Sequence, residues 1–293
     1  MRLVSLALRM STCLLALCSV LLLGTQARGE VFREDFNDNS IDPTRWTVEV
    51  WGTGPQLAEA HQQLEIVIPG SASGTDFGCK LASNFLLRGD FDVQVDFRLL
   101  TWPFSNGVRM GMGMDEQGPP QQGGVERTSF GQDDFPWEPR EVYLVGFPDG
   151  VHGIMGTSDM IGSLRLVRSG ATQTGYYYGS GGWVVIGTGP ASTADVAIKV
   201  AAWSAYEFMH WDVFTAYDNF VVNSGELVWP GAPVGACCLP EGVCLQGTEA
   251  DCRTAGGNYL GDGIPCDPDP CGSTPTKATT WGRIKSGFRS TAK

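Results

Sequence analysis

The feature that most restricts the fold is a series of segments in which polar and apolar residues alternate. Residues 91–98 read Phe-Asp-Val-Gln-Val-Asp-Phe-Arg, so every second side chain is apolar. Successive side chains of a β-strand point to opposite faces, so this segment predicts a strand with one buried and one solvated face. Similar segments occur at 63–68, 107–114, 142–147, 163–168, 175–178, 183–186, 195–202 and 212–222.

Turn residues separate these segments, and helical periodicity is absent between about Glu30 and Trp229. The 39 glycines and 17 prolines supply the turns that many short strands need. Many strands without intervening helices indicate an antiparallel sandwich or barrel. We therefore expect one all-β domain over residues 28–229.

Parts of this domain resemble concanavalin A-like lectin/glucanase (LamG-like) domains. Residues 31–46, with Val-Phe-Arg-Glu-Asp-Phe at their start, are similar to the opening strand of that family. Residues 164–183 are similar to two hairpin strands followed by a turn that ends on a tryptophan, and residues 217–223 to the closing strand, which pairs beside the first. The resemblance implies an antiparallel jelly-roll β-sandwich. It implies no particular function, because one fold carries many.

A second unit follows a Pro/Gly hinge at residues 230–234. Residues 235–272 hold six of the nine cysteines: Cys237, Cys238, Cys244, Cys252, Cys266 and Cys271. In an exported chain such a cluster predicts three disulfides, because so short a module buries too little apolar surface alone. Fifteen pairings are possible, although a bond between Cys237 and Cys238 is sterically unfavourable. A zinc site is the alternative, but paired C-x₂-C spacing and a nearby histidine are missing. The segment resembles a small cysteine-rich module of exported bacterial proteins.

The N-terminus predicts export. Arg2 and Arg9 precede an apolar run at 13–23, and Thr25-Gln-Ala27 offers small residues for cleavage after Ala27. We expect residues 1–27 to be a signal peptide and the protein to be secreted or displayed on a bacterial cell surface. A short N-terminal membrane anchor is the alternative. No later stretch approaches the ~20 apolar residues of a transmembrane helix.

Charge is distributed unevenly along the chain. Of the 20 Lys and Arg residues, two lie in the predicted leader and five in residues 272–293, which leaves 13 bases against 32 acids in the body. Such a body repels nucleic acid and is compatible with calcium or neutral sugars. Residues 273–293 form a linker and a basic amphipathic tail. A role of this tail in sorting or surface retention is one hypothesis, and a basic end without fixed structure is the alternative.

The sequence carries no recognisable catalytic constellation. A glucanase of this fold would place its acids on one strand as E-x-D-x-x-E, and that string does not occur. Asp92 and Asp96 share a face but lie ~13 Å apart along a strand, too far for a glycosidase pair. The three histidines are scattered, and there is no G-x-S-x-G motif. We expect no catalytic residues. A divergent glycoside hydrolase or polysaccharide lyase, with carboxylates from different strands, is the alternative.

A structural calcium ion is implied by the resemblance alone. Glucanases of this family often hold Ca²⁺ between the first and last strands, through the acid before the first-strand phenylalanine and an aspartate of the last strand. Asp35 and Asp218 occupy the matching positions. Turn and strand-end hydrogen bonding by these two residues is the competing explanation. No other cofactor is expected.

Recognition of an extracellular glycan or surface polysaccharide is the predicted function. Sugars stack on aromatic rings beside polar groups, and Tyr176 and Tyr178 share one face of their strand. Trp137 and Arg140 lie in a long segment, 116–140, that we expect to be a loop and hence a candidate rim of the site. A structural extracellular module without a ligand is a further alternative. The oligomeric state does not follow from the sequence.

Overall fold

A computed structural model describes residues 31–116, 123–131, 139–205, 208–231 and 233–271. The chain divides into two compact units, residues 1–228 and residues 229–293. The predicted signal peptide (1–27) and the predicted basic tail (273–293) lie outside the described residues. Among the helices of the described part, none has the length and apolar character needed to span a bilayer.

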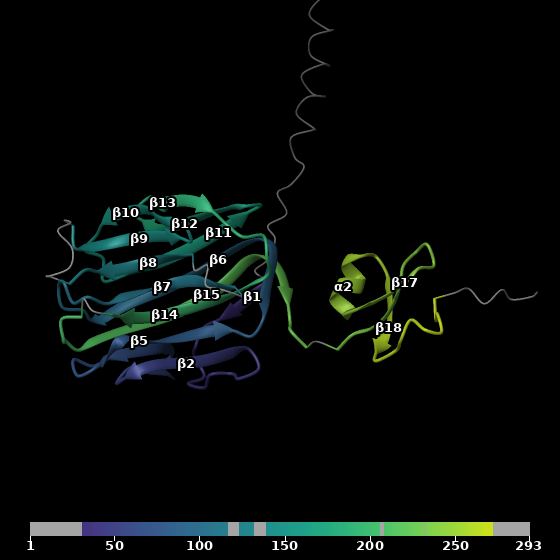
Figure 1. The fold of residues 1–293 in the computed structure, drawn as a ribbon, viewed down its shortest axis with the longest axis horizontal. Helices are drawn as coiled ribbons and strands as arrows, with labels where there is room; N and C mark the ends of the chain where they lie inside the picture. The colour runs from purple at the N-terminus through teal and green to yellow at the C-terminus, as the bar shows by residue number, and fades with distance from the viewer. Residues whose placement is uncertain (1–30, 117–122, 132–138, 206–207, 232, 272–293) are drawn as a thin grey trace, which may run out of the picture. The chain divides into compact units, whose positions relative to one another are not determined.

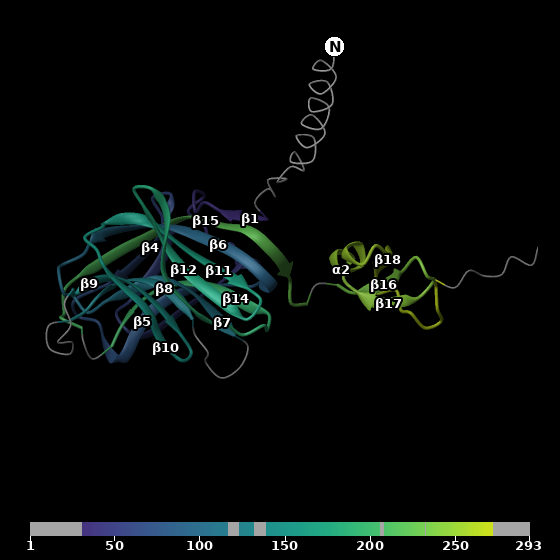
Figure 2. The same cartoon turned by 90° about the horizontal axis from the view of Figure 1, so that it is seen from above.

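The first unit consists of 15 antiparallel strands that form one continuous sheet folded into two layers, joined by the pairing of Val196 with Leu87. We call the layers the front sheet and the back sheet (Figures 1 and 2). In spatial order, the front sheet contains β10 (Gly150–Gly156), β9 (Glu141–Phe147), β8 (Gly124–Ser129), β7 (Arg109–Glu116), β14 (Val196–Ser204), β5 (Ser73–Ser83) and β2 (Trp46–Thr53). The back sheet contains β13 (Gly182–Pro190), β12 (Thr172–Gly179), β11 (Ile161–Ser169), β6 (Leu86–Thr101), β15 (Val213–Val228), β4 (Gln63–Ile68) and β3 (Gln56–Ala60). The short strand β1 (Phe32–Glu34) pairs with β15. The predicted antiparallel jelly-roll sandwich is therefore confirmed.

Alternation along the strands explains why the two sheets pack face to face. Phe91, Val93, Val95 and Phe97 of β6 are at most 3% exposed, whereas the intervening polar residues face outward. From the front sheet, Met110, Met112 and Met114 of β7 enter the same core. The core is thus filled by inward residues of both layers, as in other sandwiches.

Two tyrosines tie the layers together. Tyr143 of β9 stacks on Tyr177 of β12, with ring centroids 4.5 Å apart. Tyr217 of β15 is fully buried, and its single hydroxyl proton is shared between two carbonyl oxygens of the front sheet, those of Ala201 (2.6 Å) and Gly111 (3.0 Å). Burial raises the pKa of the Tyr217 hydroxyl well above its usual value. Tyr217 therefore stays neutral and holds the inner side of β7 and β14.

The expected loop at 116–140 is wrong in part, because β8 lies within it. Strand β8 pairs with β7 on one side and β9 on the other. Its inward residues include Arg127, which is 1% exposed and forms an ion pair with Glu141 at 2.7 Å. A charged residue that points into the core breaks the alternation of polar and apolar residues, so the sequence pattern did not predict β8.

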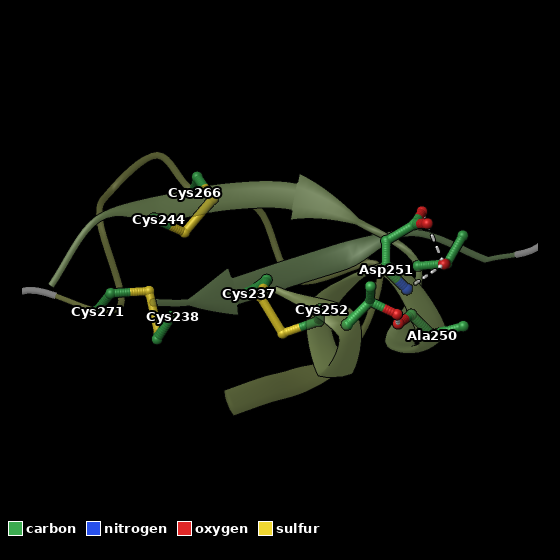
Figure 3. The surroundings of a disulfide bond; sticks show 10 residues. Cys237, Cys238, Cys244, Ala250, Asp251, Cys252, Cys266 and Cys271 are labelled. Atoms are coloured by element: carbon green, nitrogen blue, oxygen red, sulfur yellow. Dashed lines mark hydrogen bonds between the residues drawn. A yellow bond between two sulfur atoms is a disulfide. The ribbon is translucent and has the colours of Figure 1, made fainter. Parts of the chain in front are cut away.

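The second unit is a small disulfide-bonded module. It contains β16 (Gly235–Cys238), β17 (Cys244–Gly247), α2 (Glu249–Thr254) and β18 (Asn258–Asp262). Three disulfides, Cys237–Cys252, Cys238–Cys271 and Cys244–Cys266, confirm the predicted use of all six cysteines (Figure 3). Loops of this length contribute about 3–4 kcal/mol each in the chain-entropy model. Thr248 caps α2 by accepting a hydrogen bond from the Asp251 amide (3.1 Å).

Candidate functional site

The outer surface of the front sheet is hollowed across its middle strands. Two hollows of about 290 and 240 Å³ lie next to each other and share Lys199, Ala201 and Trp203 of β14 as lining residues, so we describe them together. We call this pair of hollows the front groove. Its other principal lining residues are Glu49, Trp51, Asp76, Lys80, Arg109, Gly111, Gly113, Gly124, Glu126, Leu144, Gly146 and Val151.

Glycines form the floor of the front groove. Because Met110, Met112 and Met114 of β7 point into the core, Gly111 and Gly113 occupy the outer face between them. A Cβ atom at Gly111 would lie 2.3 Å from the Val125 carbonyl oxygen, so no other residue fits without a backbone shift. Both glycines are buried, and the side chains of Glu126 and Lys199 lie beside the positions that their Cβ atoms would take. Strand β7 therefore contributes a smooth, closely packed floor to the groove.

Two indole side chains stand on either side of another glycine. Gly78 of β5 pairs with Trp51 of β2 on one side and with Trp203 of β14 on the other. The two tryptophans are thus two strand spacings apart, about 9–10 Å. A Cβ atom at Gly78 would lie 2.6 Å from the Trp203 Cβ atom, so the glycine keeps the space beside this indole open.

The front groove contains charges of both signs. Lys80 forms an ion pair with Glu49 at 3.0 Å. Lys199 and Arg109 add cations, and Asp76 and Glu126 add carboxylates. Three of the 13 bases of an acidic body thus lie in one groove, where three carboxylates balance them. Aromatic surface, hydrogen-bond donors and acceptors, and little net charge suit an uncharged polyhydroxylated ligand.

The residues proposed from the sequence for ligand binding lie elsewhere. Tyr176 and Tyr178 are on the outer face of the back sheet, and Tyr178 is 54% exposed. Arg140 donates a hydrogen bond from Nη1 to the Gly131 carbonyl oxygen at 2.5 Å. It lines a separate hollow of about 390 Å³, together with Trp102. Trp137 lies outside the described residues.

The predicted calcium ligand Asp218 lies in surroundings that disfavour its negative charge. The pKa of Asp218 is raised, first by burial and then by the negative charges of Asp96 and Asp35. One Asp218 oxygen accepts a hydrogen bond from the Asn219 amide at 2.6 Å. A divalent cation would offset the repulsion between neighbouring carboxylates, so the charge of Asp35 and Asp218 fits the expected ion.

Within the described part of the chain, three potential metal ligands cluster at a different place, in the disulfide-bonded module. Cys244, Asp269 and Cys271 have potential ligand atoms within 4.8 Å of one another. Both cysteines are in disulfides and therefore have no thiolate to offer. This group is not a metal site, and calcium at Asp35 and Asp218 stays a prediction.

Sequence reasoning did not single out Trp51, Trp203 or Glu126 as site residues. One signal for the groove was present: in residues 110–114, methionines alternate with two glycines, which predicts one bulky and one bare strand face. The neighbours of that bare face come from strands far away in the sequence, β14 and β2. Only their pairing places the two tryptophans over the front sheet.

Comparison with known proteins gives similar structures but no family assignment. No family model matches the sequence, and no curated protein matches it. The chain is similar to a putative β-glucanase from Mycobacterium abscessus (12% identity, TM-score 0.48), covering 66% of this chain and 100% of that one. It is also similar to a β-1,3-1,4-glucanase (lichenase) derived from a mouse hindgut metagenome, with 12% identity and a TM-score of 0.49, over 65% of this chain and 97% of that one. A third similar structure is lectin I-B4 from Griffonia simplicifolia, with 8% identity and a TM-score of 0.47, over 65% of this chain and 98% of that one. The fold assignment rests on the strand pairing described above.

Proposed function

We propose that this protein binds glycans outside the cytoplasm and holds sugar rings in the front groove. The observation that carries the proposal is the pair Trp51 and Trp203 in a groove whose floor is formed by glycines. Pyranose rings present a flat C–H face that packs on indole, while their hydroxyls need donors and acceptors at the edge. Lys80, Lys199 and Glu126 supply such groups around the two indoles.

The extracellular location is supported by cysteine chemistry. Three disulfides within residues 237–271 are typical of an oxidising compartment. A cleaved signal peptide at residues 1–27 is the export route that we propose. The basic tail at 273–293 is a candidate segment for surface retention. A chain truncated after Gly272 tests that role: unchanged secretion and unchanged surface attachment would contradict it.

A catalytic version of the same function is the second candidate. Glu49, Asp76 and Glu126 line the front groove from three different strands or their ends. Glycosidases need two carboxylates on opposite sides of the scissile bond. A divergent hydrolase would release reducing ends from a bound polysaccharide, and a lyase would release unsaturated products. Binding without either product supports the non-catalytic function.

The proposal is tested with the full secreted chain on a panel of neutral and anionic polysaccharides. We expect retention of at least one neutral polysaccharide, and weaker retention of anionic ones, because the body of the protein has an excess of 19 negative charges. Retention is measured by affinity electrophoresis at physiological salt. A chain that retains none of the panel, in calcium or in EDTA, would instead support a structural module.

Calcium at Asp35 and Asp218 is a separate proposal with its own test. A calcium concentration of 100 times the Kd stabilises a folded protein by about 2.7 kcal/mol. For a unit of this size we therefore expect a rise in Tm of about 5–10 °C. The rise should be reversed by EDTA, be smaller with magnesium, and be lost in Asp218→Asn. If neither calcium nor EDTA changes the Tm, the proposal that Asp35 and Asp218 bind calcium is wrong.

A further inference from the structure

The outer face of the back sheet carries a second hollow, of about 440 Å³, which we call the back cleft. It is lined by residues of five neighbouring strands, β12, β11, β6, β15 and β4. The lining residues that the argument uses are Tyr178, Ser163, Asp96, Arg98 and Asn219. None of these lines the front groove, which belongs to the other sheet.

Tyr178 provides an aromatic surface at the edge of the back cleft. Its side chain is 54% exposed, and its ring meets Trp183 edge to face, with centroids 5.2 Å apart and planes at 85°. Trp183 is in turn covered by the Arg165 guanidinium, 5.4 Å from its ring centroid. Asp92 accepts a hydrogen bond from Arg165 Nε at 2.8 Å. Tyr178 is thus supported by an ordered stack and keeps exposed ring surface for a ligand.

Tyr176 contacts Arg165 and does not line the back cleft, so its predicted part in ligand binding stays a prediction. The Arg165 guanidinium lies 5.5 Å from the centre of its ring. The Tyr176 ring therefore shares with Trp183 the task of holding Arg165. Of the two tyrosines on this face, Tyr178 is the one that borders the cleft.

Polar groups in the back cleft are held in place before any ligand arrives. Asp96 accepts hydrogen bonds from the Ser163 hydroxyl (2.6 Å) and from the Asn219 side-chain amide (3.1 Å). Asn219 is fixed further by Arg33, whose Nη2 donates to its side-chain oxygen at 2.6 Å. A carboxylate offers about four acceptor positions, so Asp96 keeps capacity for ligand hydroxyls. Pre-organised polar groups reduce the entropic cost of binding.

We propose that the back cleft is a second glycan-binding site, in which a sugar ring stacks on Tyr178 and hydrogen-bonds to Asp96 and Asn219. The ligand class rests on the function proposed for the front groove. The site itself rests on the exposed ring beside fixed acceptors and donors, the combination that neutral sugars need. Because the two sites belong to opposite sheets, one molecule could hold two glycan chains at once.

The test uses saturation-transfer NMR on the full chain, with methyl glycosides of glucose, galactose, mannose and N-acetylglucosamine as probes. The front groove is disabled by Trp203→Ala, and calcium is kept constant because Asp218 also lines the cleft. We expect Trp203→Ala to retain transfer to at least one probe. In the double variant Trp203→Ala, Tyr178→Ala, the transfer signal should fall at least five-fold. Tyr178→Phe, which keeps the ring, should retain most of it, and so should Val185→Ala, an exposed residue of the same unit that does not line the cleft.

Two results would overturn the second site. Either Trp203→Ala shows no transfer to any of the four probes, or the double variant keeps the signal of Trp203→Ala. Failure of the front groove looks different: the wild-type protein and Trp203→Ala would then give equal signals, which Tyr178→Ala alone abolishes. The two proposals can therefore fail independently.

Discussion

Replacing Trp203 with alanine is expected to weaken polysaccharide binding by the front groove about 30-fold or more. Trp203 lines both halves of the groove and is the aromatic residue that they share. Truncation of a central tryptophan in a binding site typically costs 2 kcal/mol or more, and each 1.4 kcal/mol changes affinity about tenfold. The measurement is affinity electrophoresis of the full chain against the polysaccharide that the wild-type protein retains best.

Trp211→Ala is the matched control for this prediction. Trp211 is 55% exposed and lines none of the hollows of the sandwich described above. We expect its replacement to change affinity less than twofold, within the usual range for an uninvolved surface residue. Equal effects of Trp203→Ala and Trp211→Ala, in two variants with wild-type melting curves, would exclude the front groove as the binding site.

Replacing Glu141 with alanine is expected to reduce the free energy of unfolding by about 3–5 kcal/mol. Glu141 pairs with Arg127 at 2.7 Å. It also accepts hydrogen bonds from Trp102 Nε1 (2.8 Å), the Ser105 amide (3.0 Å) and the Ser129 hydroxyl (2.5 Å). Without the carboxylate, the Arg127 guanidinium would be a buried charge without its counterion. Equilibrium unfolding in guanidinium chloride measures the loss.

An exposed ion pair provides the comparison. Glu226 contacts Arg88 at 3.1 Å, and both side chains are more than 40% exposed. Exposed pairs contribute about 1 kcal/mol or less, so we expect Glu226→Ala to be nearly neutral. If Glu141→Ala is as mild as Glu226→Ala, the Arg127–Glu141 pair does not hold β8 and β9 in the way that the structure indicates.

The part of the fold that could be predicted is the part in which a local pattern determines the outcome. The alternation of residues 91–98 predicted both the strand and its faces, and β6 has the expected inward residues. Six clustered cysteines predicted three disulfides for the same reason, since a short exported module has few other sources of stability. The choice of partners for Cys238 and Cys244 depended on the module's fold, and spacing alone left it open.

The site was harder to predict because long-range pairing creates it. The glycines of β7 are visible in the sequence as a bare strand face, but Trp203 reaches them through a pairing across about 90 residues, in which Trp203 is opposite Arg109. Strand β8 was not predicted for a related reason. A lone arginine such as Arg127 usually indicates a solvated position, and its partner Glu141 is on the next strand, β9. Strand alternation predicted that Tyr176 and Tyr178 share one face of β12, whereas the contact of Tyr176 with Arg165 depends on the neighbouring strand β11.

The most direct test of the central claim follows the tryptophan indole N–H signals of the ¹⁵N-labelled full chain during titration with an oligosaccharide of the retained polysaccharide. Signals are assigned with Trp→Phe variants. We predict saturable shifts for Trp51 and Trp203, which line the front groove, and none for Trp46, which is 3% exposed in the core. Binding that leaves the Trp51 and Trp203 signals unmoved would contradict the account, because the glycan would then occupy a different surface.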